Sequence, residues 1–126
     1  MGLLDHRTYP EVVETFQWPA LWDLVDGDRR HLNLAHECVD RWRDRGTALR
    51  LQFADGRRES WAFRDLAAWS SRFARFLERT GVERGARVAL LLDPCLPFYG
   101  ALFGTLKRGA VAVPMFTLFG PDALAP

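Results

Sequence analysis

Two runs of alternating residues lie on either side of Asp55-Gly56, near the middle of the chain. One phase of the alternation contains Leu49, Leu51, Phe53, Glu59, Trp61 and Phe63. The other phase contains Ala48, Arg50, Gln52, Arg58, Ser60 and Ala62. Alternation is typical of half-buried strands, and Asp-Gly between two such runs is typical of a tight turn. The pattern therefore predicts a β-hairpin.

Apolar residues at helical spacing predict a helix before the hairpin. It begins after Asn33, a favoured helix cap, and ends at Gly46. Its apolar positions are Leu34, Ala35, Cys38, Val39 and Trp42. We expect Glu37 and Arg41 to lie on the opposite side and to form a favourable i,i+4 pair.

A longer helix is predicted after the hairpin, over residues 64–80, and Gly81 stands where a left-handed residue commonly ends a helix. Its apolar stripe consists of Leu66, Trp69, Phe73, Phe76 and Leu77. Arg72, Arg75 and Arg79 form a basic face. Solvation is the simple explanation of such a face, and an anion site is the alternative.

The last third of the chain has short apolar runs on both sides of a helical segment. The runs are residues 87–92 and 110–113, and the segment between them, residues 97–106, is closed by Gly109. Strands without alternation are typical of a parallel sheet that is covered on both faces. We therefore predict a βαβ unit with a right-handed crossover, within an α/β fold.

Residues 1–30 form a weakly patterned amino-terminal arm. Pro10 suits the first turn of a short helix that reaches Phe16, with Thr8 or Tyr9 near its cap. The apolar residues of the arm continue with Trp18, Leu21, Trp22 and Leu24. We expect the arm to wrap onto a larger body, because so short a segment has no core of its own.

Composition narrows the class of protein. The chain has 126 residues, of which 48% are hydrophobic and 26% charged, a globular balance that suits one small domain. A formal net charge of +1 gives no support to binding of nucleic acid or of a membrane surface. No apolar run approaches the roughly 20 residues of a spanning helix. The first residues lack the apolar run of an export signal, which favours the cytoplasm.

A search for reactive motifs finds no catalytic, cofactor-binding or metal-binding residue. The sequence has no Walker loop and no G-x-G-x-x-G turn. No serine has the G-x-S-x-G setting of an activated nucleophile, and the serines considered are Ser60, Ser70 and Ser71. The histidines lack the spacing of two ligands on one helical face, and they are His6, His31 and His36. Cys38 and Cys95 lie among apolar residues, which favours buried free thiols.

Other residues have a structural and a functional interpretation. Asp93 ends the first strand of the βαβ unit, where open α/β sheets place functional groups, but an Asp before a proline is also a common turn former. Gly100 and Gly104 are interpreted as small residues that let their helix approach a neighbour closely. Lys107, the only lysine, leaves few candidates for an amine that would grip a phosphate. The five tryptophans are interpreted as packing residues rather than as stacking platforms.

Five stretches, in order, resemble the amino-terminal region of the acyl-CoA synthetase branch of the adenylate-forming (AMP-binding) superfamily. They are Leu32-Asn33-Leu34-Ala35 through Cys38-Val39-Asp40-Arg41-Trp42, then Ser60 through Leu66, then Phe73 through Leu77 with Gly81 through Ala89, then Lys107 through Pro114, and finally Phe116 through Leu124. The resemblance covers residues 31–126. Ala86 departs from it, because the family usually has an acidic residue there, and we expect little consequence in a turn.

The resemblance implies an enzyme that joins a carboxylate to ATP, usually with magnesium, and passes the acyl group from acyl-adenylate to coenzyme A. The family's phosphate loop, its aromatic-x-x-Thr-Glu motif, its ribose-holding Asp and its catalytic lysine all lie further along a longer chain. No residue of this sequence matches them, so no catalytic residue is carried over. A role in fatty acid metabolism is also implied.

These observations predict two domains of unequal completeness: the arm, residues 1–30, and a partial AMP-binding domain, residues 31–126, truncated before the phosphate loop. We expect an acyl-CoA synthetase fragment that is inactive alone and holds no cofactor itself. The alternative is a non-catalytic interaction module, docked on a chain that supplies the rest of the domain. A third alternative is an unrelated small α/β binding domain. The sequence does not identify the acyl substrate.

Overall fold

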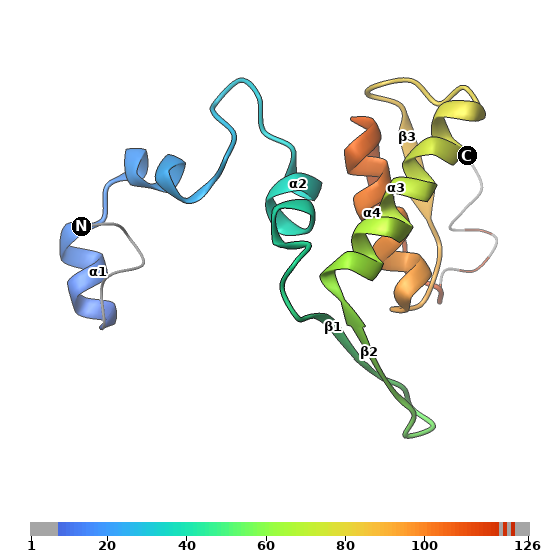
Figure 1. Cartoon of the computed structure of the whole chain (residues 1–126). Coiled ribbons are helices and arrows are strands. Elements are labelled where there is room, and N and C mark those ends of the chain that lie inside the picture. Colours follow the sequence, from blue (N-terminus) through green and yellow to red (C-terminus); the bar gives the residue numbers. More distant parts are fainter. Residues whose placement is uncertain (1–7, 119, 121, 123–126) are drawn as a thin grey trace. The chain divides into compact units, whose positions relative to one another are not determined.

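The computed structural model describes residues 8–118, 120 and 122, and its chain divides into two compact units (Figure 1). The first unit is Met1–Leu32 and the second is Asn33–Pro126, and each is described by itself. His6 lies outside the described residues, as does the last part of the stretch Phe116 through Leu124.

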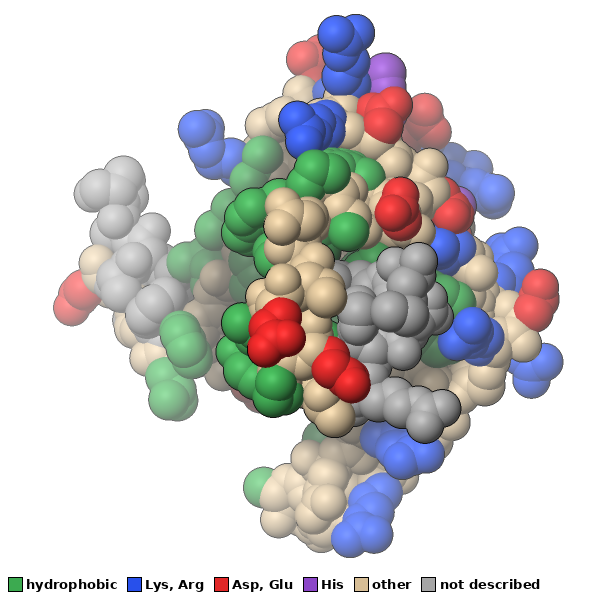
Figure 2. All heavy atoms as spheres, turned by 90° about the vertical axis from the view of Figure 1, so that its left-hand side faces the viewer, with side chains coloured by type: hydrophobic (Ala, Val, Ile, Leu, Met, Phe, Trp, Pro, Cys, Tyr) green, Lys and Arg blue, Asp and Glu red, His purple; other side chains and the backbone are tan. Residues whose placement is uncertain are grey.

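The amino-terminal unit consists of two short helices. Helix α1 (Tyr9–Thr15) begins, as predicted, after Thr8, whose N–H donates to Glu11 Oε2 at 3.0 Å. The 3₁₀ helix η2 (Trp18–Leu24) follows and was not expected. Large apolar side chains of this unit are exposed, among them Tyr9, Val13, Trp18 and Leu32. On the face shown in Figure 2, hydrophobic side chains lie at the surface among acidic and basic ones.

The helix predicted behind Asn33 is confirmed at its start and breaks early. Asn33 Oδ1 accepts the N–H groups of Ala35 and His36, at 2.9 and 3.4 Å. Helix α2 covers only Leu34–Cys38, and the chain continues as the 3₁₀ helix η3 (Asp40–Trp42). The indole of Trp42 donates to the carbonyl of Glu37 at 2.7 Å. A continuing α-helix needs that carbonyl for the N–H of residue 41, and here the indole five residues further along bonds to it instead.

Two burial predictions for this segment are wrong. Cys38 is exposed rather than buried, because it lies on the same side of α2 as the exposed Leu34, four residues earlier, and Cys95 is only half-buried. Glu37 does not face solvent, since only 8% of its surface is accessible. The predicted partner Arg41 lies 2.5 Å from Glu37 Oε2 and neutralises the buried carboxylate, so the pairing itself is confirmed.

The hairpin and the long helix agree with the sequence pattern. Strands β1 (Thr47–Gln52) and β2 (Arg58–Ala62) pair antiparallel, and the turn between them has Gly56 at φ 86°. Helix α3 (Phe63–Arg79) follows at once, and the N–H of Ala62 donates to Asp65 Oδ2 at 3.1 Å. Phe76 is the exception in the predicted apolar stripe, since it is exposed and only touches the ring of Phe73.

The predicted βαβ unit is present. Strand β3 (Arg87–Leu90) pairs parallel with β4 (Val111–Pro114), and helix α4 (Leu96–Arg108) connects them. Gly109 ends α4 at φ 74°, in the left-handed region that favours glycine. Helix α4 contacts α3 and both strands (Figure 1). The predicted α/β fold class, with a hairpin, a long helix and a parallel unit, is confirmed.

The core of this unit forms where α3, α4 and the hairpin meet. Its buried residues are Val39, Leu66, Ala67 and Leu96, with Leu49, Trp61, Trp69, Tyr99 and Phe103 packed against them. Gly104 lies where a Cβ atom would be 2.7 Å from the carbonyl oxygen of Ser70, and a Cβ at Gly100 would be 3.0 Å from the Cβ of Trp69. Both glycines therefore permit close helix packing, as predicted. Trp18 is exposed, so the packing interpretation of the tryptophans is wrong there.

One face of the parallel strand pair carries no layer among the described residues. Val111 and Val113 are 49% and 37% exposed, and Leu91 and Leu92 beyond β3 are each 43% exposed. From the continuous apolar pattern we predicted that other elements cover both faces of this sheet. Within residues 33–118, helix α4 packs against one of the two faces. We name the face formed by Val111 and Val113 the bare sheet face.

We expect the 126-residue chain to self-associate through the bare sheet face and the strand edges beside it, because apolar strands with unpaired edges attract other chains. Replacing Val111 and Val113 by lysine should shift the population towards monomer. Sedimentation velocity over a range of concentrations measures this, with Leu34→Lys, at an exposed apolar residue of α2, as the control. A parent chain that stays monomeric throughout would refute the expectation.

Candidate functional site

The carboxyl ends of the two parallel strands meet at one edge of the second unit. The N–H of Met115 donates to the carbonyl of Leu90 at 2.9 Å and extends the pairing beyond β4. Beyond that bond, Thr117 Oγ1 donates to Asp93 Oδ1 at 2.6 Å. The sequence left both a turn and a functional role open for Asp93. In the structure its carboxylate connects the segments that follow β3 and β4.

A hollow of about 230 Å³ lies between these strand exits. It is lined by Leu92, Asp93, Pro94, Phe98, Pro114, Met115, Phe116 and Thr117. Open α/β sheets bind ligands at this edge, outside the carboxyl ends of the strands. We name it the strand-exit pocket. Its lining is mostly apolar with a single carboxylate, so it suits contact with an apolar group more than proton transfer.

The serines and histidines form no catalytic pair among the described residues. Ser70 is buried and donates to the carbonyl of Ala67 at 3.1 Å. His31 lies beside Asp28 at 3.4 Å and is exposed. The N–H of Arg30, and after it that of His31, hold the pKa of Asp28 below its ordinary value by bonding to the carboxylate. Within the described residues no three His, Cys, Asp or Glu side chains come together in a group that could hold a metal ion.

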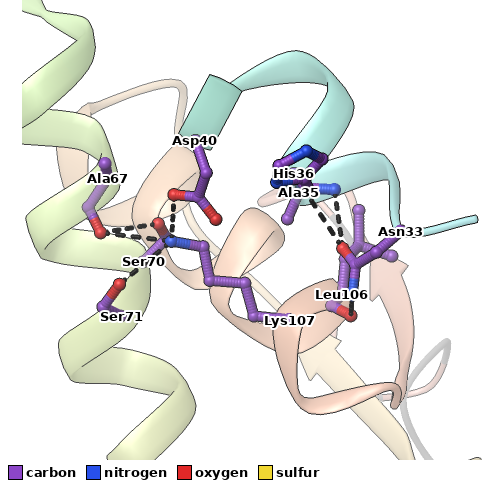
Figure 3. A network of polar contacts seen from close by, with 9 residues as sticks. All are labelled: Asn33, Ala35, His36, Asp40, Ala67, Ser70, Ser71, Leu106 and Lys107. Atoms are coloured by element: carbon purple, nitrogen blue, oxygen red, sulfur yellow. Dashed lines mark hydrogen bonds and ion pairs between the residues drawn. The ribbon is translucent and has the colours of Figure 1, made fainter. Parts of the chain in front are cut away.

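Lys107 has a structural role in this fold. Its Nζ donates to Asp40 Oδ1 at 2.6 Å, to Ser71 Oγ at 3.0 Å and to the carbonyl of Ala67 at 3.3 Å (Figure 3). The side chain is 13% exposed. One cation therefore joins η3, α3 and α4, and all three of its protons have acceptors.

The basic face predicted on α3 is exposed, and Arg72 lies over the ring of Trp69 at 5.1 Å. A second basic region lies on the hairpin and was not singled out from sequence. There a hollow of about 490 Å³ is lined by Arg50, Leu51, Gln52, Arg58, Glu59 and Ser60. We name it the hairpin groove. Arg50, Gln52, Arg58 and Ser60 belong to the second phase of the alternation, which is the signal that could have found this groove.

The sequence profile of the family described as AMP-binding enzyme matches residues 36–126, most of the chain. The chain belongs to the AMP-binding enzyme family. Among its relatives, the acetyl-coenzyme A synthetase of Bacillus subtilis is 31% identical over 127 aligned residues, which cover 95% of this chain and 22% of the relative. A crotonobetaine/carnitine–CoA ligase of Proteus mirabilis is 33% identical over 91 residues, 72% of this chain and 18% of the relative.

Solved structures also resemble this AMP-binding chain. An acyl-CoA synthetase of Brucella canis superposes with a TM-score of 0.85 and 30% identity, over 94% of this chain and 22% of that one. The resemblance to the acyl-CoA synthetase branch is therefore confirmed, and the chain spans about a fifth of the length of these relatives. No helix in the described part of the AMP-binding chain has the length and apolarity to cross a membrane.

Proposed function

We propose that this chain is the amino-terminal scaffold of an AMP-forming acid–thiol ligase, which turns a carboxylate into acyl-CoA through an acyl-adenylate. The observation that supports this most is the superposition of 94% of the chain on an acyl-CoA synthetase. ATP, magnesium, coenzyme A and a fatty-acid type of carboxylate belong to the proposal for the whole enzyme, and so does the cytoplasm as its compartment.

Within that enzyme the described residues contribute binding and positioning rather than chemistry. The strand-exit pocket offers one carboxylate, Asp93, already bonded to Thr117, and apolar side chains around it. An apolar lining excludes water and helps a bound group keep its position. Adenylate formation needs groups that neutralise phosphate charge. The side chains that line the strand-exit pocket include no such cation.

The test is carboxylate-dependent exchange of labelled pyrophosphate into ATP. We expect the 126-residue chain, assayed with short, medium and long carboxylates, to give no exchange above the blank without carboxylate. A complete acyl-CoA synthetase assayed in parallel is the positive control. Clear exchange by this chain alone would refute the proposal that its residues contribute binding and positioning rather than chemistry.

A second candidate function is favoured by the bare sheet face. The chain would be a non-catalytic module that docks on another polypeptide, which covers Val111 and Val113 and supplies the remaining strands. The downstream coding sequence separates the two candidates. A reading frame with the missing phosphate loop favours the ligase, and an unrelated frame favours the docking module.

A further inference from the structure

The hairpin groove has an unusual charge arrangement for a two-stranded ribbon. Arg50 is paired with Ser60 and Gln52 with Arg58, so the two arginines occupy diagonal positions on the exposed face. Long side chains on such a diagonal reach one another. Guanidinium groups on such a diagonal repel each other, and an anion between them relieves the repulsion.

The carboxylate nearest in sequence does not supply that anion. Glu59 is paired with Leu51, which is buried on the inner face of the ribbon. Glu59 Oε2 accepts the indole N–H of Trp61 at 3.1 Å, and its Oε1 accepts from Arg57. Arg57 in turn lies over the ring of Phe53 at 3.9 Å. Both carboxylate oxygens are thus occupied by groups other than Arg50 and Arg58.

The remaining side chains of the exposed face add donors rather than negative charge. Gln52 carries an amide and Ser60 a hydroxyl, whose one contact in the structure is with the hydroxyl of Thr47 at 3.5 Å. The hollow between them measures about 490 Å³, which exceeds the size of a single small ion. A second basic hollow, lined by Arg43, Arg45 and Arg64 together with Asp44, is smaller, at about 350 Å³.

We propose that the hairpin groove binds a phosphate-bearing small molecule of diphosphate size, with Arg50 and Arg58 as a clamp and Gln52 and Ser60 as further donors. Guanidinium forks match the oxygens of phosphate and make charge-assisted hydrogen bonds to it. The net charge of +1 for the whole chain, and only two arginines in the clamp, favour a small anion over nucleic acid. The proposal does not depend on the proposed function.

The experiment is equilibrium dialysis of the 126-residue chain against labelled inorganic pyrophosphate, at constant ionic strength set with chloride. We expect saturable retention, and slower hydrogen exchange in peptides covering residues 47–62 when pyrophosphate is present. In the double variant Arg50→Gln/Arg58→Gln the affinity should fall about tenfold or more, because two charge-assisted contacts are lost. Gln52→Glu, which puts a carboxylate opposite Arg58, should weaken binding similarly.

Arg75→Gln, at an exposed arginine of α3, is the matched control and should retain the affinity of the parent chain. Displacement by excess ATP would assign the groove to the phosphate chain of a nucleotide, and retention against ATP would assign it to free diphosphate. The proposal fails if the parent chain retains no pyrophosphate. It also fails if the double variant binds as tightly as Arg75→Gln, or if protection maps outside the hairpin.

Discussion

Gly104→Val is expected to lower the free energy of unfolding by about 3 kcal/mol, the upper part of the usual range for overpacking a tight contact. A Cβ at this position would lie 2.7 Å from the carbonyl oxygen of Ser70 and 2.8 Å from Cβ of Phe73. These atoms belong to or lie next to the backbone of α3, so no flexible side-chain end can move aside. The two helices would have to separate. Urea denaturation followed by circular dichroism measures the loss.

Gly46→Ala is the matched control, because a Cβ at Gly46 meets nothing within 4 Å and its φ is not in the left-handed region. Its effect should stay within about 0.5 kcal/mol, as for most unstrained surface substitutions. All variants are compared at one low protein concentration, so that self-association contributes equally. If Gly104→Val were as stable as the parent chain, the close approach of α3 and α4 would be wrong.

The elements predicted well from sequence are those fixed by neighbouring residues. The turn at Gly56, the start of α2 after Asn33 and the end of α4 at Gly109 each follow from the chemistry of one or two residues. The spacing of the apolar residues then predicted which segments are strands and which are helices. Local rules were sufficient there because no distant contact competes with them.

The predictions that failed involve contacts between residues not adjacent in the pattern. The helix behind Asn33 breaks because the indole of Trp42 takes the carbonyl of Glu37. Spacing alone could place Glu37 on a polar side, but its burial depends on Arg41 and on the break. The bare sheet face is a similar case. Its apolar residues predict that another element packs against it, but α4 packs only against the opposite face of those strands.

The candidate sites were harder to predict than the fold. The strand-exit pocket depends on Asp93 meeting Thr117, which lies on the exit of the other strand. Alternation already placed Arg50 and Arg58 in one phase, whereas the engagement of the carboxylate of Glu59 by Trp61 on the inner face is a matter of side-chain geometry. A sequence pattern predicts on which face of a hairpin a side chain lies, but it does not predict which charged side chains pair.

Lys107→Met is expected to lower the free energy of unfolding by about 2 kcal/mol, the usual cost of losing hydrogen bonds to a charged group. The methionine keeps the length of the aliphatic chain, so packing changes little. What is lost is the bond to Asp40 at 2.6 Å, together with the donors to Ser71 and to the carbonyl of Ala67. Asp40, with 34% of its side chain exposed, would keep a charge without this cation. Urea denaturation at neutral pH measures the effect.

A double-mutant cycle separates this ion pair from the rest of the network. Asp40→Asn alone should also destabilise the chain, and the double variant should lose clearly less than the sum of the two single losses, because residues in direct contact couple by about 0.5–3 kcal/mol. Arg75→Met removes an exposed cation from α3 and is the matched control, expected to stay within about 0.5 kcal/mol. Strict additivity between positions 40 and 107 would mean that the cation contributes through Ser71 and the carbonyl of Ala67 instead of through Asp40.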